Sequence, residues 1–290
     1  MSLTTVKRTI RGRVLRPIVA RVFPGAVGTD TSQPLPVSVP GSGATVVVTD
    51  LGEGPAILLV HPGSTTAAAW AGCAAALSDR FRVLSHDRPT YRRVPALRGA
   101  AAMDAEVDEV LAIADVAMEP VLLVGHSSGG VVALESALAA PERFSGLVLY
   151  EPPVAVDAPL GGDALRRARS ALDAGAPGRA MAIFVRDISG GSPLLARLFS
   201  RRWAAAQLAD AEAIESLGVG LDRYAGLDLP TLLIGGERSP AHLRARLDAL
   251  AAVLPRVDRT VILPGQGHLA TLRAPHLVTA AIASFADRVA

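Results

Sequence analysis

Ser127 stands at the centre of the segment Gly-His-Ser-Ser-Gly, between four apolar residues and an alanine-rich run. Residues 121–124 form a continuous apolar run that predicts a short buried strand. Beyond Gly129 the apolar positions recur at helical spacing, and Pro141 predicts the end of that helix. A serine on such an abrupt strand-to-helix turn presents its hydroxyl oxygen above the sheet edge, near the helix N-terminus. The segment therefore predicts a nucleophile for acyl chemistry.

A serine nucleophile needs a base, and the chain has six histidines. His268 follows the last predicted strand and precedes the last predicted helix. Because parallel strands present their C-terminal ends at one sheet edge, this loop should meet the loop of Ser127, which makes His268 the predicted base. His86 also follows a predicted strand, but a basic segment comes after it, so it is the second candidate. His242 and His276 stand at predicted helix starts and are expected to face solvent.

Attack on an acyl carbon also requires hydrogen-bond donors for the developing oxyanion. The geometry of the turn makes the backbone N–H of Ser128 one such donor. The second donor is expected from the loop after the predicted strand at residues 57–60. Pro62 has no N–H in that loop, so Gly63 is the first candidate and Ser64 the next.

Strand-like and helical segments alternate along most of the chain beyond residue 44. This alternation predicts an α/β fold with a mostly parallel central sheet flanked by helices on both faces. Helices are expected at residues 70–77, 104–118, 129–140 and 241–253 and from 276 onward. Strands are expected at residues 45–49, 56–60, 81–85, 121–124, 147–150, 230–236 and 260–263.

Two segments interrupt this order. Residues 1–43 are expected to be an N-terminal basic arm and linker, because basic residues gather near the start and residues 33–43 are rich in Pro, Ser and Gly. The arm is expected to be a helix or strap packed on the domain, or else a basic arm facing a membrane. Residues 157–226 are rich in Ala and Arg, with at least three helical pieces, and predict a helical cap. The core would then comprise residues 44–156 and 227–290.

Composition limits the possible partners. Half of the 290 residues are hydrophobic, which provides a sizeable core, and the net charge of +2 gives no argument for a nucleic-acid partner. Cys73 is the only cysteine, which excludes internal disulfides and cysteine-based metal sites. No apolar stretch is long enough to span a bilayer, and arginines stand where a signal peptide needs an apolar run. We expect a cytoplasmic protein with a small-molecule substrate, no cofactor and no stable membrane insertion; the oligomeric state stays open.

The segments Gly-His-Ser-Ser-Gly, His-Pro-Gly and Gly-His together resemble the α/β-hydrolase superfamily, over roughly residues 44–290. The resemblance implies the α/β-hydrolase fold with an inserted helical cap and a substrate pocket between sheet edge and cap. It further implies an ester-type hydrolase with a Ser–acid–His triad and no metal. Position by position, it implies Ser127 as nucleophile, His268 as base, and Gly63 and Ser128 as oxyanion donors. Pro62 departs from the usual His-Gly pattern of the family.

The acid departs further from the family pattern. Members often carry Asp in a turn after the strand that ends here at residue 234, and this chain has Ser239 at that place. Glu237, two residues earlier, is one candidate acid. Glu151 is the preferred one, because it follows a buried strand at the same sheet edge and precedes two prolines that stiffen its backbone. A site that has lost its acid is the third possibility.

These residues predict a carboxylesterase-like serine hydrolase that cleaves a small or medium ester, lactone or thioester through an acyl-enzyme on Ser127. Serine as nucleophile argues against relatives that open epoxides or displace halide through Asp. Two alternatives stay open, a non-hydrolytic lyase or cyclase, favoured by Ser239, and a ligand-binding member.

The arginines of the predicted cap are either contacts for an acidic substrate or solvated helix faces. They include Arg166, Arg167, Arg169, Arg186, Arg201 and Arg202.

Overall fold

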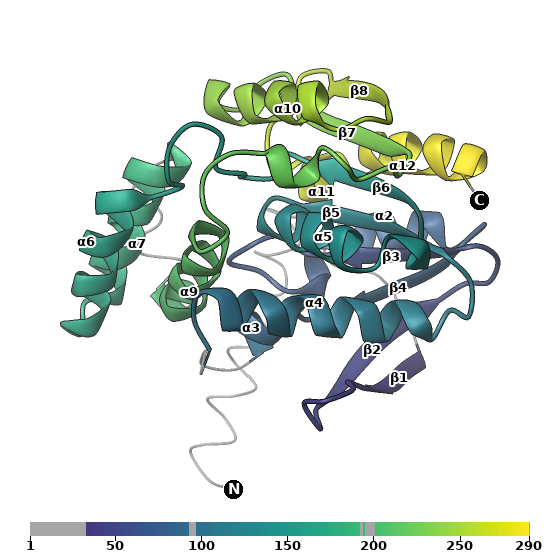
Figure 1. Ribbon diagram of the computed structural model, residues 1–290, viewed down its shortest axis with the longest axis horizontal. Helices are drawn as coiled ribbons and strands as arrows, with labels where there is room; N and C mark the ends of the chain where they lie inside the picture. The colour runs from purple at the N-terminus through teal and green to yellow at the C-terminus, as the bar shows by residue number, and fades with distance from the viewer. Residues whose placement is uncertain (1–32, 93–96, 192–193, 195–200, 290) are drawn as a thin grey trace, which may run out of the picture.

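The computed structural model describes residues 33–92, 97–191, 194 and 201–289. Most of the predicted basic arm, residues 1–32, lies outside these ranges. Within them the strands form one eight-stranded sheet in the order β1-β2-β4-β3-β5-β6-β7-β8 (Figure 1). Strand β2 is antiparallel to both neighbours, and all other neighbours are parallel. The strands are β1 (Gln33–Ser38), β2 (Thr45–Leu51), β3 (Ala56–Val60), β4 (Arg82–His86), β5 (Val121–His126), β6 (Phe144–Tyr150), β7 (Thr231–Gly236) and β8 (Val257–Leu263).

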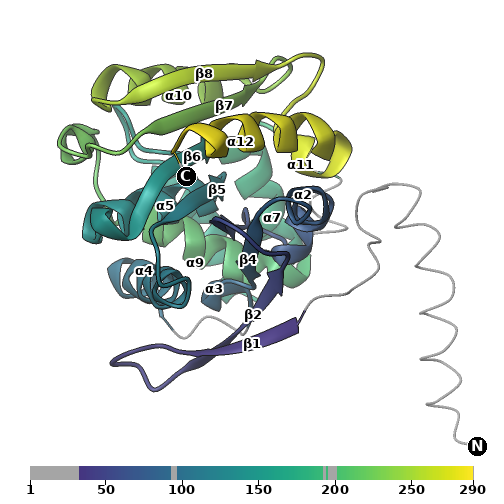
Figure 2. The same ribbon diagram turned by 90° about the vertical axis from the view of Figure 1, so that its right-hand side faces the viewer.

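Helices cover both faces of this sheet, which confirms the predicted α/β-hydrolase fold class. Helices α4, α5 and α10 lie on one face and α2, α11 and α12 on the other (Figure 2). No helix in the described ranges has the length and apolarity needed to cross a membrane. Their bounds are α2 (Ala71–Leu77), α3 (Pro89–Arg92), α4 (Ala100–Asp115), α5 (Ser128–Ala139), α10 (Ala241–Val253), α11 (Ala270–Arg273) and α12 (Pro275–Val289), with short turns η1 (Ala67–Trp70), η2 (Pro141–Arg143) and η5 (Asp222–Tyr224).

Apart from His126 and Thr231 at two strand ends, the central strands β3, β5 and β7 have no polar side chains, because both of their faces are covered. Every residue of β3, β5 and β7 is buried. Their odd and even positions contribute to different apolar clusters, one on each face of the sheet. Continuous apolar runs are the expected pattern for parallel strands between two helical layers. This sheet fixes the loops at its C-terminal edge, where the candidate site residues lie.

The predicted linker is wrong at its start, because residues 33–38 form the edge strand β1. Pairing with β2 is antiparallel, and Val37 lies opposite Val46. Side chains alternate in this segment, with Pro36 exposed and Val37 buried. Proline lacks the N–H that a central strand needs, but an edge strand tolerates it on its open side. The two prolines indicated a loop, whereas the alternation of exposed and buried side chains identifies a strand.

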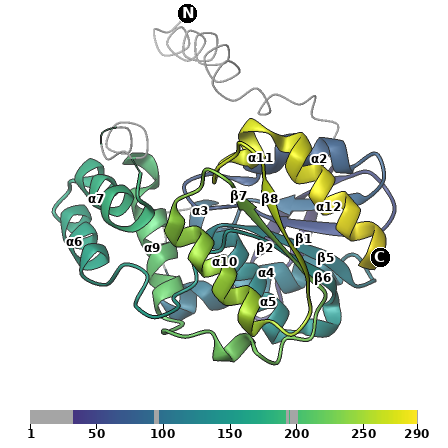
Figure 3. The same ribbon diagram turned by 90° about the horizontal axis from the view of Figure 1, so that it is seen from above.

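The described residues of the segment predicted as a cap, 157–226, form a layer of helices beside the strand ends (Figures 1 and 3). This layer has an apolar cluster of its own, in which Leu165, Met181, Phe184 and Leu208 are buried. Helix α9 also packs against α3, α4 and α5 of the core. Its described elements are α6 (Gly162–Asp173), α7 (Pro177–Phe184), the π-helical turn η3 (Val185–Ser189), the 3-10 turn η4 (Arg201–Trp203), α9 (Ala204–Glu215) and the turn η5 given above. We call residues 157–226 the cap from here on.

Candidate active site

Ser127 lies on the sharp turn between β5 and α5, as predicted. Its φ of 54° and ψ of −127° are unusual for a residue with a side chain. The turn is held on both sides, because the Ser127 N–H donates to the Tyr150 carbonyl at 2.8 Å and its own carbonyl accepts from the Gly130 N–H at 2.8 Å. The side chain makes no capping hydrogen bond to α5. Backbone strain of this kind is typical of functional positions.

The two flanking glycines are required by close backbone approach. A Cβ on Gly125 would lie 2.4 Å from the carbonyl oxygen of Gly129. A Cβ on Gly129 would lie 2.5 Å from the carbonyl oxygen of His61 and 2.6 Å from that of Val60. These carbonyls belong to β3, to the residue after it and to the first turn of α5, and such packed backbone cannot move aside cheaply. The glycines therefore allow α5 to start directly above β3, with its first N–H groups at the strand ends.

His268 and Glu151 meet at the C-terminal edge of the sheet. His268 Nδ1 lies 2.6 Å from Glu151 Oε2. The second carboxylate oxygen, Oε1, accepts a hydrogen bond from the Gly236 N–H at 2.7 Å, and the Glu151 side chain is 1% exposed. Glu151 also has a positive φ of 46°, and its N–H donates to the carbonyl of Ile234 at 3.1 Å. The end of β7 thus fixes the carboxylate that faces the histidine.

The other candidates for acid and base lie elsewhere. Glu237 is exposed, and its Oε2 accepts a hydrogen bond from the Gly265 N–H at 2.5 Å. Ser239 Oγ is buried and has no hydrogen-bond partner among the described residues. His86 is buried at the end of β4, where its Nε2 lies 3.9 Å from Glu109 Oε2. The structure therefore brings Glu151, and not Glu237, to His268.

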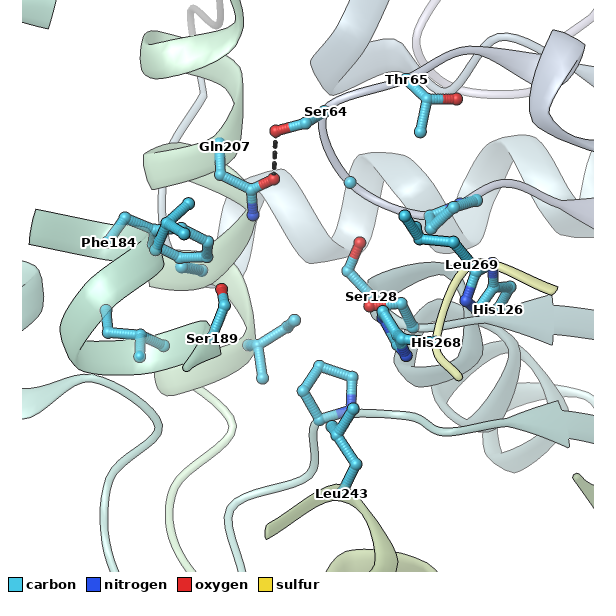
Figure 4. Close-up of a pocket in the computed structure, with 18 of the residues that line it drawn as sticks. Ser64, Thr65, His126, Ser128, Phe184, Ser189, Gln207, Leu243, His268 and Leu269 are labelled. Atoms are coloured by element: carbon cyan, nitrogen blue, oxygen red, sulfur yellow. Dashed lines mark hydrogen bonds between the residues drawn. The ribbon is translucent and has the colours of Figure 1, made fainter. Parts of the chain in front are cut away.

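Two aromatic side chains support the His268 loop from below. The hydroxyl of Tyr150 donates to the carbonyl of Gly267 at 2.5 Å. The His126 ring stacks on Tyr150 at 4.5 Å between ring centroids, and its centroid lies 4.8 Å from that of His268 (Figure 4). Burial lowers the pKa of His126 well below its ordinary value, and the nearby His268 adds to this effect. His126 is therefore a neutral packing partner of the loop.

The loop predicted to supply the second oxyanion donor is fixed by a neutral histidine. His61 Nε2 accepts a hydrogen bond from the Arg88 N–H at 2.9 Å, and its Nδ1 donates to the carbonyl of Pro62 at 2.8 Å. Burial, reinforced by the charge of Arg88, lowers the pKa of His61 to about 3, so the ring stays neutral. Farther along this loop, the Ser64 hydroxyl donates to Gln207 Oε1 of the cap at 2.7 Å (Figure 4).

Arg88 is a buried residue of the site that the sequence did not indicate. Its side chain is fully buried, with Nε 2.9 Å from Glu106 of α4 and Nη2 2.7 Å from Asp210 of α9. Its Nη1 donates to the Ser128 hydroxyl at 2.9 Å. Burial alone would lower the pKa of Arg88, but the charges of Asp210 and Glu106 outweigh it and raise the pKa. We call Arg88, Glu106, Asp210 and Ser128 the Arg88 cluster.

A cavity of about 450 Å³ lies between the sheet edge and the cap. Side chains of the cap, including Phe184 and Gln207, face those of the sheet edge across it (Figure 4). His242 is half-buried and lines the cavity, so its predicted position in solvent is wrong. Among the described residues, no group of three or more His, Cys, Asp or Glu side chains could hold a metal ion. The site residues that line the cavity are Gly63, Ser127, Ser128 and His268.

A model of the family described as "Alpha/beta hydrolase family" matches residues 57–281. The chain belongs to this family. A solved α/β hydrolase from Sphaerobacter thermophilus superposes with a TM-score of 0.71 at 26% identity, over 87% of this chain and 99% of the other. A thermophilic esterase from Thermogutta terrifontis superposes with a TM-score of 0.68 at 23% identity, over 89% and 99% of the two chains. At that identity the second likeness shows the fold alone.

Curated relatives match over shorter segments. A pimeloyl-[acyl-carrier protein] methyl ester esterase from Methylococcus capsulatus is 35% identical over 91 residues, which cover 31% of this chain and 34% of the relative. An uncharacterised protein from Mycobacterium tuberculosis is 35% identical over 94 residues, or 31% of this chain and 27% of the relative. The chain thus spans about a third or less of the length of these relatives.

Proposed function

We propose that this α/β-hydrolase family member is a serine hydrolase that forms an acyl-enzyme on Ser127. In this proposal His268 is the base, Glu151 the acid, and the N–H groups of Gly63 and Ser128 are the oxyanion donors. The observation that carries the proposal is the contact between the buried Glu151 carboxylate and the partly exposed His268 ring, 2.6 Å apart, beside the strained turn of Ser127 at one cavity. A base and an orienting group beside a serine on this turn are what nucleophilic catalysis requires.

The reaction then follows from this geometry. Because His268 Nδ1 faces Glu151, Nε2 is the nitrogen left to accept the Ser127 proton while Oγ attacks the carbonyl carbon. The imidazolium that forms is stabilised by the adjacent carboxylate. It then donates the proton to the leaving oxygen or sulfur as the bond to the acyl carbon breaks. His268 then takes a proton from water, whose oxygen attacks the acyl carbon. The proton passes to Ser127 Oγ as the acyl–enzyme bond breaks and the acid is released.

The proposed substrates are esters, lactones or thioesters of small or medium size, the chemistry of a carboxylesterase. The cavity of about 450 Å³ supports this size range, and its cap wall includes the apolar side chains of Leu160, Met181 and Phe184. The methyl ester esterase described above, 35% identical over 91 residues, supports ester chemistry. A location in the cytoplasm stays a prediction from the sequence.

Of the two alternatives, the lyase or cyclase rested on the absence of an acid at Ser239. The contact between Glu151 and His268 removes that argument. A ligand-binding member would bind without turnover, and the experiment below distinguishes it from a hydrolase.

A fluorophosphonate tests the proposal directly, because it reacts with an activated serine. Intact-mass analysis of the full chain should show one added phosphonyl group, mapped to Ser127. Ser127→Ala should abolish labelling, whereas Ser64→Ala, a serine on the opposite loop, should keep it. A screen of 4-nitrophenyl esters, lactones and thioesters should then find turnover. Labelling at Ser128, or no labelling of the folded protein, would contradict a serine hydrolase.

A further inference from the structure

Arg246 on α10 is a half-buried guanidinium in the cavity wall. Its Nε donates to the carbonyl of Val154 at 2.9 Å, which fixes the side chain beside the start of the cap. In the part of the chain that the structure describes, this is its one hydrogen bond, and no carboxylate lies within ion-pair distance. Burial lowers the pKa of Arg246, and no nearby carboxylate offsets this effect. The two Nη groups are therefore available to a ligand.

The charge in the cavity has one sign. Besides Arg246, the titratable side chains of its described lining are His126, His242 and His268, and neither Asp nor Glu lines it. Burial lowers the pKa of His242, and the charge of Arg246 lowers it further. Arg246 is therefore the permanently charged side chain of the described cavity lining, and it has no described carboxylate within ion-pair distance. Such a charge is costly without a partner and favours an anion of single charge.

Two comparisons within the chain show that this arrangement is specific to Arg246. The buried Arg88 has Glu106 and Asp210 as ion-pair partners, so its charge is balanced by the protein. Of the six cap arginines that the sequence offered as contacts for an acidic substrate, four pair with carboxylates of the cap, Arg201 and Arg202 are exposed, and none of these described residues lines the cavity. These pairs are Arg166 and Arg167 with Asp163, Arg169 with Glu212, and Arg186 with Asp187.

We propose that Arg246 binds a carboxylate of the substrate, so that the enzyme acts on esters, lactones or thioesters that carry a free carboxylate away from the bond that is cleaved. The two Nη groups of a guanidinium match the two oxygens of a carboxylate. A single carboxylate also balances the single charge, whereas a phosphate dianion would leave one negative charge in the cavity. This inference rests on the proposed function, because Ser127 must cleave the same molecule.

The test compares substrates that differ only in this charge. Mono-4-nitrophenyl esters of dicarboxylic acids are compared with 4-nitrophenyl alkanoates of equal chain length, and acetyl esters of ω-hydroxy acids with acetyl esters of the matching alcohols. The two pairs place the carboxylate on the acyl side or on the alcohol side. In the native enzyme the carboxylate-bearing member of at least one pair should have the higher kcat/KM.

Arg246→Gln should lower kcat/KM for that substrate by roughly 10- to 100-fold, mainly through KM, the range expected for a hydrogen bond to a charged group. Neutral esters should change less than about threefold, because the amide keeps a donor for the Val154 carbonyl and Ser127 is untouched. Arg246→Lys should retain part of the preference. Arg244→Gln is the matched control, since Arg244 is on the same helix, exposed, and paired with Asp248.

Equal losses on charged and neutral substrates, or no preference for the carboxylate in either pair, would overturn the inference. Its failure is distinguishable from that of the proposed function. If the fluorophosphonate labels Ser127 and neutral esters turn over, the hydrolase proposal stands without the carboxylate site. If Ser127 is not labelled in folded protein, the hydrolase proposal fails first.

Discussion

The carboxylate of Glu151 faces a donor at each oxygen, the Gly236 N–H at Oε1 and the ring of His268 at Oε2. An amide has one acceptor oxygen, so Glu151→Gln must turn an NH₂ group toward one of these donors. Either the histidine loses its orienting acceptor or a buried N–H loses its partner. We therefore expect Glu151→Gln to slow acylation by up to about 10⁴-fold, as loss of the orienting carboxylate does in serine triads. Stopped-flow release of 4-nitrophenol from an activated ester measures this step.

Glu237→Gln is the matched control for that experiment. Glu237 is exposed and contacts a loop N–H, so the same change in charge should alter acylation less than about threefold. Circular dichroism of both variants checks that they are folded. If Glu237→Gln is the inactive variant, the assignment of the acid is wrong. If neither substitution matters, the acid has no role in acylation.

Some residues of the site could be predicted because local sequence fixes their place. Ser127 and Ser128 follow from a short strand, a glycine-bounded turn and a helix, and His268 follows from its position after a parallel strand. Arg88 and Arg246 could not be found in this way. Their roles depend on which carboxylates the core and the cap place near them, and an arginine in a polar segment otherwise indicates a solvated surface.

At the scale of elements, the Arg88 cluster joins four parts of the chain that are distant in sequence. Arg88 follows β4, Glu106 belongs to α4, Asp210 to α9 and Ser128 to α5. The hydroxyl of Tyr91 also donates to Asp210, at 2.7 Å. The cluster therefore couples the docking of a cap helix to the position of the predicted oxyanion donor.

Replacing Arg88 alone should strongly lower the free energy of unfolding. Arg88→Met leaves the buried Glu106 and Asp210 without their shared partner, and breaking a buried ion pair in this way costs about 3–5 kcal/mol. Urea unfolding followed by circular dichroism measures the free energy of unfolding. Arg166→Met is the control, because Arg166 is an exposed residue of α6 and should change this free energy by no more than the experimental error. Equal stability of Arg88→Met and the native chain would show that the cluster does not hold α9.

The sequence predicted the order of these elements better than their ends. The helix expected at residues 104–118 is α4, Ala100–Asp115, because Gly99, with its positive φ, provides an earlier start. Strand β1 was missed because its two prolines indicated a loop, and the alternation of apolar and polar side chains around them is short. The helices of the cap were expected as pieces, but their packing depends on the contacts of α9 with the core, which no local pattern encodes.

At the scale of the whole molecule, three buried histidines make the fold sensitive to acid. Burial lowers the pKa of His86 and His126 well below the ordinary value of 6.5 and that of His61 to about 3. In the unfolded chain these rings titrate near pH 6.5. Below that pH the unfolded state therefore binds protons, whereas the rings of the folded state stay neutral. Above it both states are neutral and no stability is lost. The free energy of unfolding should therefore fall as pH drops below about 6.5, by up to about 1.4 kcal/mol per pH unit for each histidine.

His86→Leu tests this account because His86 is buried and neither of its ring nitrogens has a hydrogen-bond partner among the described residues. The variant removes one group that binds a proton only on unfolding. Between pH 6 and pH 5 the free energy of unfolding of the variant should then fall less steeply than that of the native protein. The two slopes should differ by up to about 1.4 kcal/mol per pH unit, whatever the stability of the variant at pH 7.5. Urea titrations at several pH values give both slopes. Carboxylates distant from His86 contribute equally to the two proteins, so Glu109, whose Oε2 lies 3.9 Å from His86 Nε2, is the one whose contribution a Glu109→Gln background removes. An unchanged slope would mean that His86 is protonated in the folded protein.

The same variant tests whether His86 could replace His268 as the base. Because His86 lies outside the cavity lining, hydrolysis of a 4-nitrophenyl ester at pH 7.5 should survive the substitution.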